Sequence, residues 1–355
     1  MRRVELDELD VNQKLGKTIC DENGRVLLRF GTMLTLSFMD KLKAMGITSV
    51  YVEDGISEGI ETEDMLSEKT TQEAKDSVKN MVNRFSVSGT ANYQGVIKST
   101  GAIIDEILEN KNIMMSVTDI RTKDEILFSH SISVCSLATT TALKLGYNVS
   151  KLKDIAVGAL LHDIGKVKII KDKKLKHSDF QKLDEDVKKS HPKVGYDMLG
   201  DNVEIGSVSK VIALLHHENF DGSGFPMGLA NDKIHETARI VAICNAFDNM
   251  VTGNSSFGDI PVYQIVEYLT NSSDKFDPNI AKVFVENLAI YPNGTTVELS
   301  DKSKGIVVRQ NYGLPTRPRV RVLVNKDGSN LKEPYEIGLE EQLSLFITKT
   351  AKIGE

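Results

Sequence analysis

Residues 160–166 read LLHDIGK and place a histidine next to an aspartate at the end of an apolar helical pattern. The apolar residues before this pair recur at spacings of three and four, as on the buried face of a helix. They are Leu152, Ile155, Ala156, Ala159 and Leu160. Ser150 is the expected N-cap, and the chain is expected to turn at Gly165. Because successive helical residues diverge by about 100°, His162 and Asp163 can address two different ions.

A second apolar pattern precedes this helix and carries another histidine. It comprises Leu127, His130, Val134, Leu137, Ala138 and Thr141 and ends near Gly146. This spacing places His130 on the buried face of the predicted helix. Further helices are predicted over residues 203–217, 236–250, 261–270 and 278–289. The middle of the chain is therefore expected to be a helical domain.

The whole sequence divides into four segments by pattern and composition. Residues 1–56 alternate short apolar runs with turn signals and predict a small α/β module. Residues 57–118 are expected to be a linker and a helix; as far as about residue 99 they are polar, and a linker is favoured there over a solvated helix. Residues 119–290 form the helical domain. Residues 291–355 contain TTVEL, GIVVR and VRVLV and predict a small β module.

The composition is that of a folded globular protein without a nucleic-acid surface. The 355 residues are 40% hydrophobic and 26% charged, and the formal net charge is −6. This length suits two or three domains. A net negative charge disfavours a bulk electrostatic grip on DNA or RNA, so an anionic ligand must be held locally.

The cysteines and the apolar runs indicate a cytoplasmic location. Cys20, Cys135 and Cys244 lie far apart without metal-binding spacing, as free thiols in a reducing compartment do. The first residues, MRRVELDELD, are acidic where a signal peptide is apolar, and no apolar run is long enough to span a membrane. Export and membrane insertion are therefore not expected.

Five of the seven histidines fall within 88 positions, on or beside the predicted helices. They are His130, His162, His191, His216 and His217. Any one of them alone would be read as a hydrogen-bonded core residue. Several neutral imidazoles together with the Asp163 carboxylate are instead what a pair of first-row transition metals requires. A water between two such ions loses a proton easily, and the bound hydroxide is then the expected nucleophile.

Four ordered motifs resemble the HD-GYP family. They are HSISV at 130–134, LLHDIGK at 160–166, HPKVG at 191–195 and HHENFDGSGFP at 216–226, and ARIVAICNAFDNM at 238–250 resembles the closing segment of the family. The resemblance covers about residues 119–290 and implies an HD-type bundle of five to seven helices. The expected fold is therefore mainly α, with a small α/β module before the bundle and a small β module after it.

The resemblance also implies roles for individual residues. The implied metal ligands are His130, His162, Asp163, His191, His216, His217 and Asn245. Asp163 and Lys166 are the implied catalytic residues. The ammonium of Lys166 can stabilise the negative charge that gathers on an attacked phosphate. The alternative for Lys166 is an interaction with a helix dipole. The implied substrate-binding residues are Lys166, Asp221, Gly222, Gly224, Phe225, Pro226 and Asp248. Residues 221–226 are called the GFP loop below.

Three positions depart from the family pattern. Phe225 replaces the usual tyrosine and keeps the ring without its hydroxyl. Members with three metals carry a glutamate where this chain has Ile126, so a third metal is not expected. Asn245 replaces a ligand aspartate, and its amide oxygen is a weaker, uncharged ligand. Asp248 could compensate for that change, or could simply form a hydrogen bond on its helix face.

The implied activity is hydrolysis of the 3′,5′-phosphodiester of cyclic di-GMP or a related cyclic dinucleotide by a metal-bridged hydroxide. The implied product is linear pGpG, with GMP if cleavage continues. One alternative is an inactive HD-GYP domain that senses the nucleotide or recruits a signalling partner through the GFP loop. A second alternative is an HD-type nucleotidase, which would not need the motif at 216–226.

The implied cofactors are two divalent transition metal ions, with iron or manganese favoured and zinc admitted by the same ligands. Expected partners are the cyclic dinucleotide and signalling proteins at the GFP loop. The resemblance also admits a homodimer. No DNA, RNA or membrane partner is expected.

Overall fold

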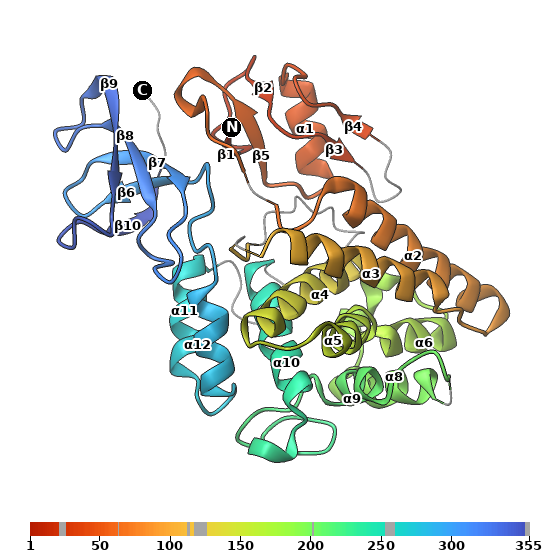
Figure 1. Ribbon diagram of the computed structural model, residues 1–355. Coiled ribbons are helices and arrows are strands. Elements are labelled where there is room, and N and C mark those ends of the chain that lie inside the picture. Colours follow the sequence, from red (N-terminus) through yellow and green to blue (C-terminus); the bar gives the residue numbers. More distant parts are fainter. Residues whose placement is uncertain are drawn as a thin grey trace. The chain divides into compact units, whose positions relative to one another are not determined.

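A computed structural model describes residues 1–20, 26–62, 64–111, 114–116, 126–200, 202–252 and 260–351 (Figure 1). The helices are α1 (Leu36–Ala44), α2 (Glu68–Ser88), α3 (Gln94–Glu109), α4 (Ile126–Lys144), α5 (Val149–Leu161), α6 (Ile164–Lys173), α7 (Glu185–Lys189), α8 (His191–Leu199), α9 (Ser207–Leu215), α10 (Glu236–Val251), α11 (Val262–Asn271) and α12 (Pro278–Glu286). The strands are β1 (Arg2–Glu5), β2 (Lys14–Leu15), β3 (Ile19–Cys20), β4 (Val26–Leu28), β5 (Ser49–Glu53), β6 (Thr296–Leu299), β7 (Lys304–Arg309), β8 (Arg319–Val324), β9 (Asn330–Gly338) and β10 (Ile347–Thr350). The predicted fold class, a helical bundle with small modules at both ends of the chain, is confirmed.

The chain forms two compact units. One contains residues 1–64 together with the residues from 286 onward, and the other contains residues 65–117 and 126–285. The second unit is the helical one. The first residues of the predicted helical domain, 119–125, lie outside the described residues.

The first unit joins the two ends of the chain. Its N-terminal part is an antiparallel sheet in the order β1-β5-β2, and its C-terminal part is an antiparallel sheet in the order β10-β6-β7-β8-β9. The predicted strands TTVEL, GIVVR and VRVLV correspond to β6, β7 and β8.

The two parts of this unit share a small apolar core. Ile60, at the end of the N-terminal part, packs with Ile306, Leu323 and Val324 of the C-terminal sheet. The guanidinium of Arg321 donates a hydrogen bond to the backbone oxygen of Glu58 at 2.7 Å. The sequence predicts two separate modules at these ends, because apolar periodicity carries no information about which distant segments pack together.

The helical unit is built from pairs of helices in contact. α4 packs on α5, α5 on α9, α6 on α8, and α10 on α4 (Figure 1). α4 ends two residues before Gly146, as predicted. Two predicted helix starts are wrong. Asn148, not Ser150, caps α5 by accepting the Lys151 N–H, and α9 begins only at Ser207.

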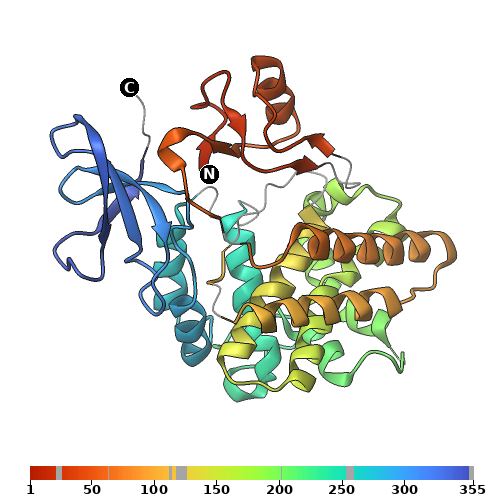
Figure 2. The same ribbon diagram turned by 45° about the horizontal axis from the view of Figure 1, so that its top comes forward.

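The segment that was favoured as a linker contains a long helix. α2 begins at its N-cap Ser67 and ends at Gly89, whose positive φ of 75° ends the helix as a left-handed C-cap. Its buried face carries Val78, Met81 and Phe85. α2 packs against α3 and α4 (Figure 2). The low overall hydrophobicity of this stretch hid a narrow apolar stripe, and the helix is part of the helical unit.

Two glycines let the helices that carry the histidines approach closely. A Cβ on Gly158 in α5 would lie 2.6 Å from Ile212 Cδ1 in α9. A Cβ on Gly165 would lie 2.0 Å from the backbone oxygen of His191. Gly165 was expected at a turn, but it lies inside α6, where its missing side chain admits the start of α8.

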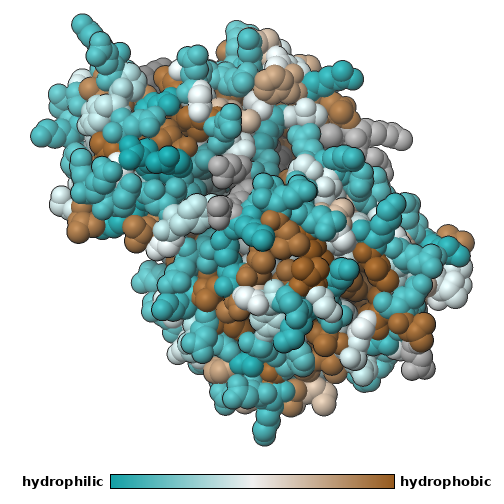
Figure 3. All heavy atoms as spheres, in the orientation of Figure 1, coloured by the Kyte–Doolittle hydropathy of each residue, from teal (hydrophilic) through white to brown (hydrophobic). Residues whose placement is uncertain are grey.

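Within the described residues, no helix is both long and apolar enough to cross a membrane. Hydrophilic residues cover most of the face of the protein in Figure 3, with hydrophobic residues exposed in places.

We predict that Gly165→Ala separates α6 from α8. The new methyl group cannot fit beside the His191 carbonyl, so we expect a loss of about 1–3 kcal/mol in the free energy of unfolding. Gly101→Ala is the matched control, because Gly101 lies inside α3 and a Cβ there would meet nothing within 4 Å. Chemical denaturation of both variants measures the difference. Equal stability of the two variants would contradict the packing argument.

Candidate metal centre

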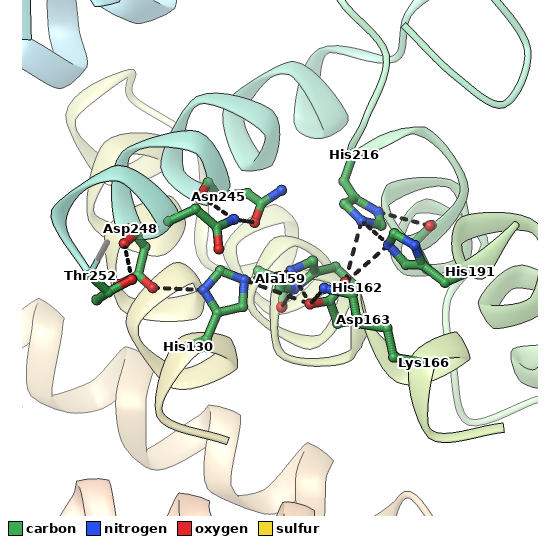
Figure 4. Close-up of polar contacts among 12 residues, drawn as sticks. His130, Ala159, His162, Asp163, Lys166, His191, His216, Asn245, Asp248 and Thr252 are labelled. Atoms are coloured by element: carbon green, nitrogen blue, oxygen red, sulfur yellow. Dashed lines mark hydrogen bonds and ion pairs between the residues drawn. The ribbon is translucent and has the colours of Figure 1, made fainter. Parts of the chain in front are cut away.

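The candidate metal ligands come from the ends of four helices and from within two others. His162 and His216 are the C-caps of α5 and α9, Asp163 lies between α5 and α6, and His191 begins α8. His130 lies in α4, and Asn245 lies in α10. Figure 4 shows the side chains of His130, His162, Asp163, His191 and His216 directed toward one another.

Three of the histidines are oriented by backbone carbonyls. The Nδ1 of His162 donates to Ala159 O at 2.7 Å, that of His191 to Lys188 O at 2.6 Å, and that of His216 to Ala213 O at 2.9 Å. A carbonyl oxygen can only accept, so in the neutral ring the proton lies on Nδ1. Each Nε2 therefore has a free lone pair that points into the cluster.

His130 is oriented by a carboxylate. Its Nδ1 lies 2.6 Å from Asp248 Oδ2, and the Asp248 side chain is fully buried. A carboxylate behind an imidazole fixes the tautomer and makes the ring a stronger metal ligand. We expected Asp248 beside the substrate, as a substitute ligand or in a hydrogen bond on its helix face, and the structure places its carboxylate in a hydrogen bond with His130.

The free lone pairs face one another at short range. The Nε2 atoms of His130 and His162 lie 3.3 Å apart, and those of His191 and His216 lie 3.2 Å apart. Asp163 Oδ1 lies 3.2 Å from His191 Nε2 and has no hydrogen-bond donor among the described residues. Buried acceptors in this arrangement repel one another unless a cation lies between them. The donor set therefore fits metal ions.

The protonation states also suit metal binding. Burial lowers the pKa of His162 and of His217 well below the usual range, and it lowers the pKa of His191 to about 4. These rings are therefore neutral at neutral pH, which is the form that coordinates metals. Burial alone would raise the pKa of Asp163, but the neighbouring Lys166 ammonium outweighs it and holds that pKa well below its ordinary value.

Asp163 divides the cluster into two groups that share it. One group is Asp163, His191, His216 and His217, and the other is His130, His162 and Asp163; in each, the donor atoms lie within 4.8 Å of one another. Oδ1 of Asp163 faces His191 and His216 at 3.2 and 3.7 Å. Oδ2 faces His130 and His162 at 3.7 and 3.5 Å. A carboxylate with one oxygen toward each group can bridge two ions.

Lys166 lies beside the bridge. Its Nζ is 2.5 Å from Asp163 Oδ2, and its side chain is 20% exposed. Lys166 belongs to the first turn of α6, since Ile164 begins that helix. The helix-dipole alternative required Lys166 near a helix C-terminus, so the structure removes that alternative.

Asn245 is buried on α10, one turn before Asp248. Its side-chain oxygen accepts a hydrogen bond from the Asn249 amide at 2.8 Å. An amide oxygen has two lone pairs, so one remains for a metal. The side chain of Ile126, the position of the third-metal glutamate in the family, is not among the described side chains.

The GFP loop packs directly on the cluster through Phe225. The rings of Phe225 and His217 are stacked, with centroids 4.6 Å apart and planes at 16°. A Cβ on Gly224 would lie 2.5 Å from the backbone oxygen of His217. Gly224 thus lets the loop fold back onto the histidine pair.

Two residues that sequence analysis missed hold this loop. The buried Glu218 carboxylate accepts the backbone N–H groups of Met227 and Leu229 at 2.6 and 2.9 Å. Lys275 binds Asp221 at 3.4 Å and the Ser223 hydroxyl at 2.6 Å. Asp221 therefore has a structural partner. The only signal for Glu218 was its place directly after the histidine pair, and nothing in the sequence linked Lys275 to the loop.

Comparisons with known proteins agree with this geometry. Residues 109–280 match the HD domain family, and residues 296–355 match the family of KOW domains associated with HD domains. The fold resembles Bd1817, a HDG"Y"P protein from Bdellovibrio bacteriovorus, with a TM-score of 0.51 at 18% identity over 80% of this chain and 97% of that one.

The chain is also similar to curated phosphodiesterases. It is 30% identical to a cyclic di-GMP phosphodiesterase of Pseudomonas aeruginosa over 62% of this chain and 54% of that protein. It is 30% identical to a cyclic di-GMP phosphodiesterase of Thermotoga maritima, with 51% and 48% covered. The helical domain belongs to the HD-GYP family.

Another curated relative is named for a different substrate. A 3′3′-cGAMP-specific phosphodiesterase of Vibrio cholerae is 27% identical over 53% of this chain and 43% of that protein. The chain spans about half the length of these curated relatives.

We predict that Asp248→Asn weakens metal binding without unfolding the HD-GYP domain. The amide retains the size of the side chain but loses the charge behind His130, and such changes typically reduce metal affinity by about 10–100-fold. Metal titration followed by elemental analysis measures the loss. Asp197→Asn is the control, because Asp197 is exposed and pairs with Lys193 on α8. Wild-type metal affinity in Asp248→Asn would show that His130 does not depend on this carboxylate.

We predict that Asn245→Asp raises metal affinity and resistance to chelators. The substitution adds one negative charge at a buried donor position while keeping its shape, so each bound cation is attracted more strongly. Metal titration of wild type and variant measures occupancy, and we expect two ions per chain at saturation. Identical titration curves would mean that residue 245 is not a ligand.

Proposed function

We propose that this chain is a metal-dependent phosphodiesterase that opens cyclic di-GMP or a related cyclic dinucleotide. The observation that carries the proposal is the Asp163 carboxylate, shared by two groups of imidazoles whose free Nε2 atoms converge. Support for the substrate class comes from the similarity to named cyclic di-GMP and cGAMP phosphodiesterases. The proposed product is linear pGpG, with GMP if cleavage continues.

The proposed roles follow from the contacts of each residue. The residues that would hold two divalent ions are His130, His162, His191, His216, His217 and Asn245, and Asp163 would be shared by both ions. Metal ions in such a centre supply a water of lowered pKa and neutralise charge on the attacked phosphate. Lys166, one helical turn from the bridge, stabilises charge on a phosphate oxygen. Asp248 keeps the His130 lone pair directed at the ions.

The types of ligand atom indicate which metals the site would bind. It contains nitrogen and oxygen donors and no thiolate among the clustered residues, which suits iron, manganese or zinc. We propose iron or manganese, with zinc as an alternative.

A second candidate is a nucleotide sensor without turnover, and Asn245 is the observation that favours it. Asn245 carries no charge at a position proposed to bind metal. Among the described residues, Asp163 is then the only carboxylate that belongs to both groups of metal ligands. Such a domain would bind the dinucleotide and pass the signal to a partner protein, with the GFP loop as the proposed contact.

The test is a turnover assay with cyclic di-GMP on the protein loaded with iron or manganese, with the products separated by chromatography. We expect hydrolysis that chelation abolishes and metal restores. Lys166→Ala should lower kcat by about 100-fold or more, the usual size of electrostatic stabilisation, without changing metal content. Lys168→Ala is the control, because Lys168 pairs with Asp172 on the same helix.

The results of these assays distinguish the phosphodiesterase from the sensor and from the nucleotidase. Binding of cyclic di-GMP without turnover by fully loaded protein would favour the sensor. Equal kcat values for Lys166→Ala and wild type would remove Lys166 from the reaction. Cleavage of mononucleotides in preference to cyclic dinucleotides would point to the nucleotidase.

A further inference from the structure

One member of the metal-ligand cluster is less buried than the others. His130, His162, Asp163, His191 and His216 are all buried, with at most 4% of any of them exposed. His217 is the half-buried member of the same donor set. The Phe225 ring is stacked on this less buried histidine.

An exposed lysine lies near the Phe225 ring. Lys189 is the last residue of α7, two positions before His191, and its side chain is exposed. Its Nζ lies 5.9 Å from the centre of the Phe225 ring. His217, Phe225 and Lys189 thus form a series from the cluster to the solvent, in which a cation follows an aromatic ring.

The other lysines around this site already have carboxylate partners. Lys188 pairs with Glu185 at 2.5 Å, Lys193 with Asp197 at 2.7 Å, and Lys166 with Asp163 at 2.5 Å. Among the described residues, no carboxylate lies within ion-pair distance of Lys189. Its ammonium therefore makes no ion pair with these residues, although its charge still acts on Glu185 one turn earlier in α7.

A cyclic dinucleotide presents two anionic groups, because it has two phosphodiesters and each carries one negative charge. One of them would lie over the ions beside Lys166. The second must find a cation in a chain whose net charge is −6. We infer that Lys189 binds this second phosphodiester, with Phe225 as the apolar surface between the two phosphate positions. The inference rests on the proposed function and makes Lys189 a residue that selects two-phosphate substrates.

The experiment compares a cyclic dinucleotide with a substrate that has one phosphodiester. Steady-state kinetics are measured on metal-loaded protein with cyclic di-GMP and with bis(p-nitrophenyl) phosphate. For Lys189→Ala we expect KM for cyclic di-GMP to rise about tenfold or more, the effect of losing one charge-assisted hydrogen bond. We expect kcat for cyclic di-GMP and both constants for the small diester to stay at wild-type values.

Two further variants separate charge from structure. Lys189→Arg keeps the positive charge and should restore most of the affinity. Lys193→Ala removes an exposed lysine that is already paired and should leave both substrates unaffected. Higher salt should raise KM for cyclic di-GMP in wild type more than in Lys189→Ala, because screening weakens a contact that the variant lacks.

An unchanged KM for cyclic di-GMP in Lys189→Ala would overturn the inference. An equal loss on both substrates would also overturn it, because the variant would then have disturbed the metal centre. If wild type binds cyclic di-GMP without cleaving it, the proposed enzymatic function fails, and calorimetric affinities of wild type and Lys189→Ala decide the Lys189 inference alone. If wild type does not bind cyclic di-GMP at all, both fail.

Discussion

Mutual repulsion of buried lone pairs is the constraint on which the helical unit depends. Four imidazole Nε2 atoms lie in two pairs, 3.2 and 3.3 Å apart. Beside them lies the Oδ1 atom of Asp163, which has no hydrogen-bond donor among the described residues. Backbone carbonyls and Asp248 hold the protons on the opposite side of each ring. The fold thus brings hydrogen-bond acceptors together in a buried place where they repel one another. Cations bound between these acceptors would relieve the repulsion. Because a preformed cluster of this kind costs folding free energy, metal binding and folding are coupled.

The cluster can form only if several helices approach more closely than ordinary side chains permit. Gly158 and Gly165 remove the side chains at two of these contacts, one between α5 and α9 and one between α6 and α8. Each contact joins helices whose ends carry donors, so helix packing determines the distance between His162 and His216 and between Asp163 and His191. The HDIG sequence therefore serves both packing and chemistry, since its glycine lies two positions after its aspartate.

The candidate metal ligands can be predicted from the sequence better than the hydrogen-bond partners that orient them. His130 and His162 could be placed on a buried face because their neighbours follow helical periodicity. The carbonyls of Ala159, Lys188 and Ala213 are independent of side-chain type, so no pattern marks them. The contact between Asp248 and His130 spans 118 positions and depends on how α10 packs on α4. The long helix α2 was missed for a similar reason, because its apolar stripe matters only once α3 and α4 lie beside it.

Charge connects the donor set to the class of substrate. The clustered donors carry a single negative charge, that of Asp163, because the histidines are neutral ligands and Asn245 is an amide. Two divalent ions would bring four positive charges, so a loaded centre would keep a large positive surplus and attract an anionic phosphodiester. An aspartate at position 245 would reduce this surplus and hold the ions more tightly. Under the proposed function, the asparagine would favour attraction of an anionic substrate at the expense of metal retention, and the burial of His130, His162 and Asp163 would limit loss of the ions to solvent.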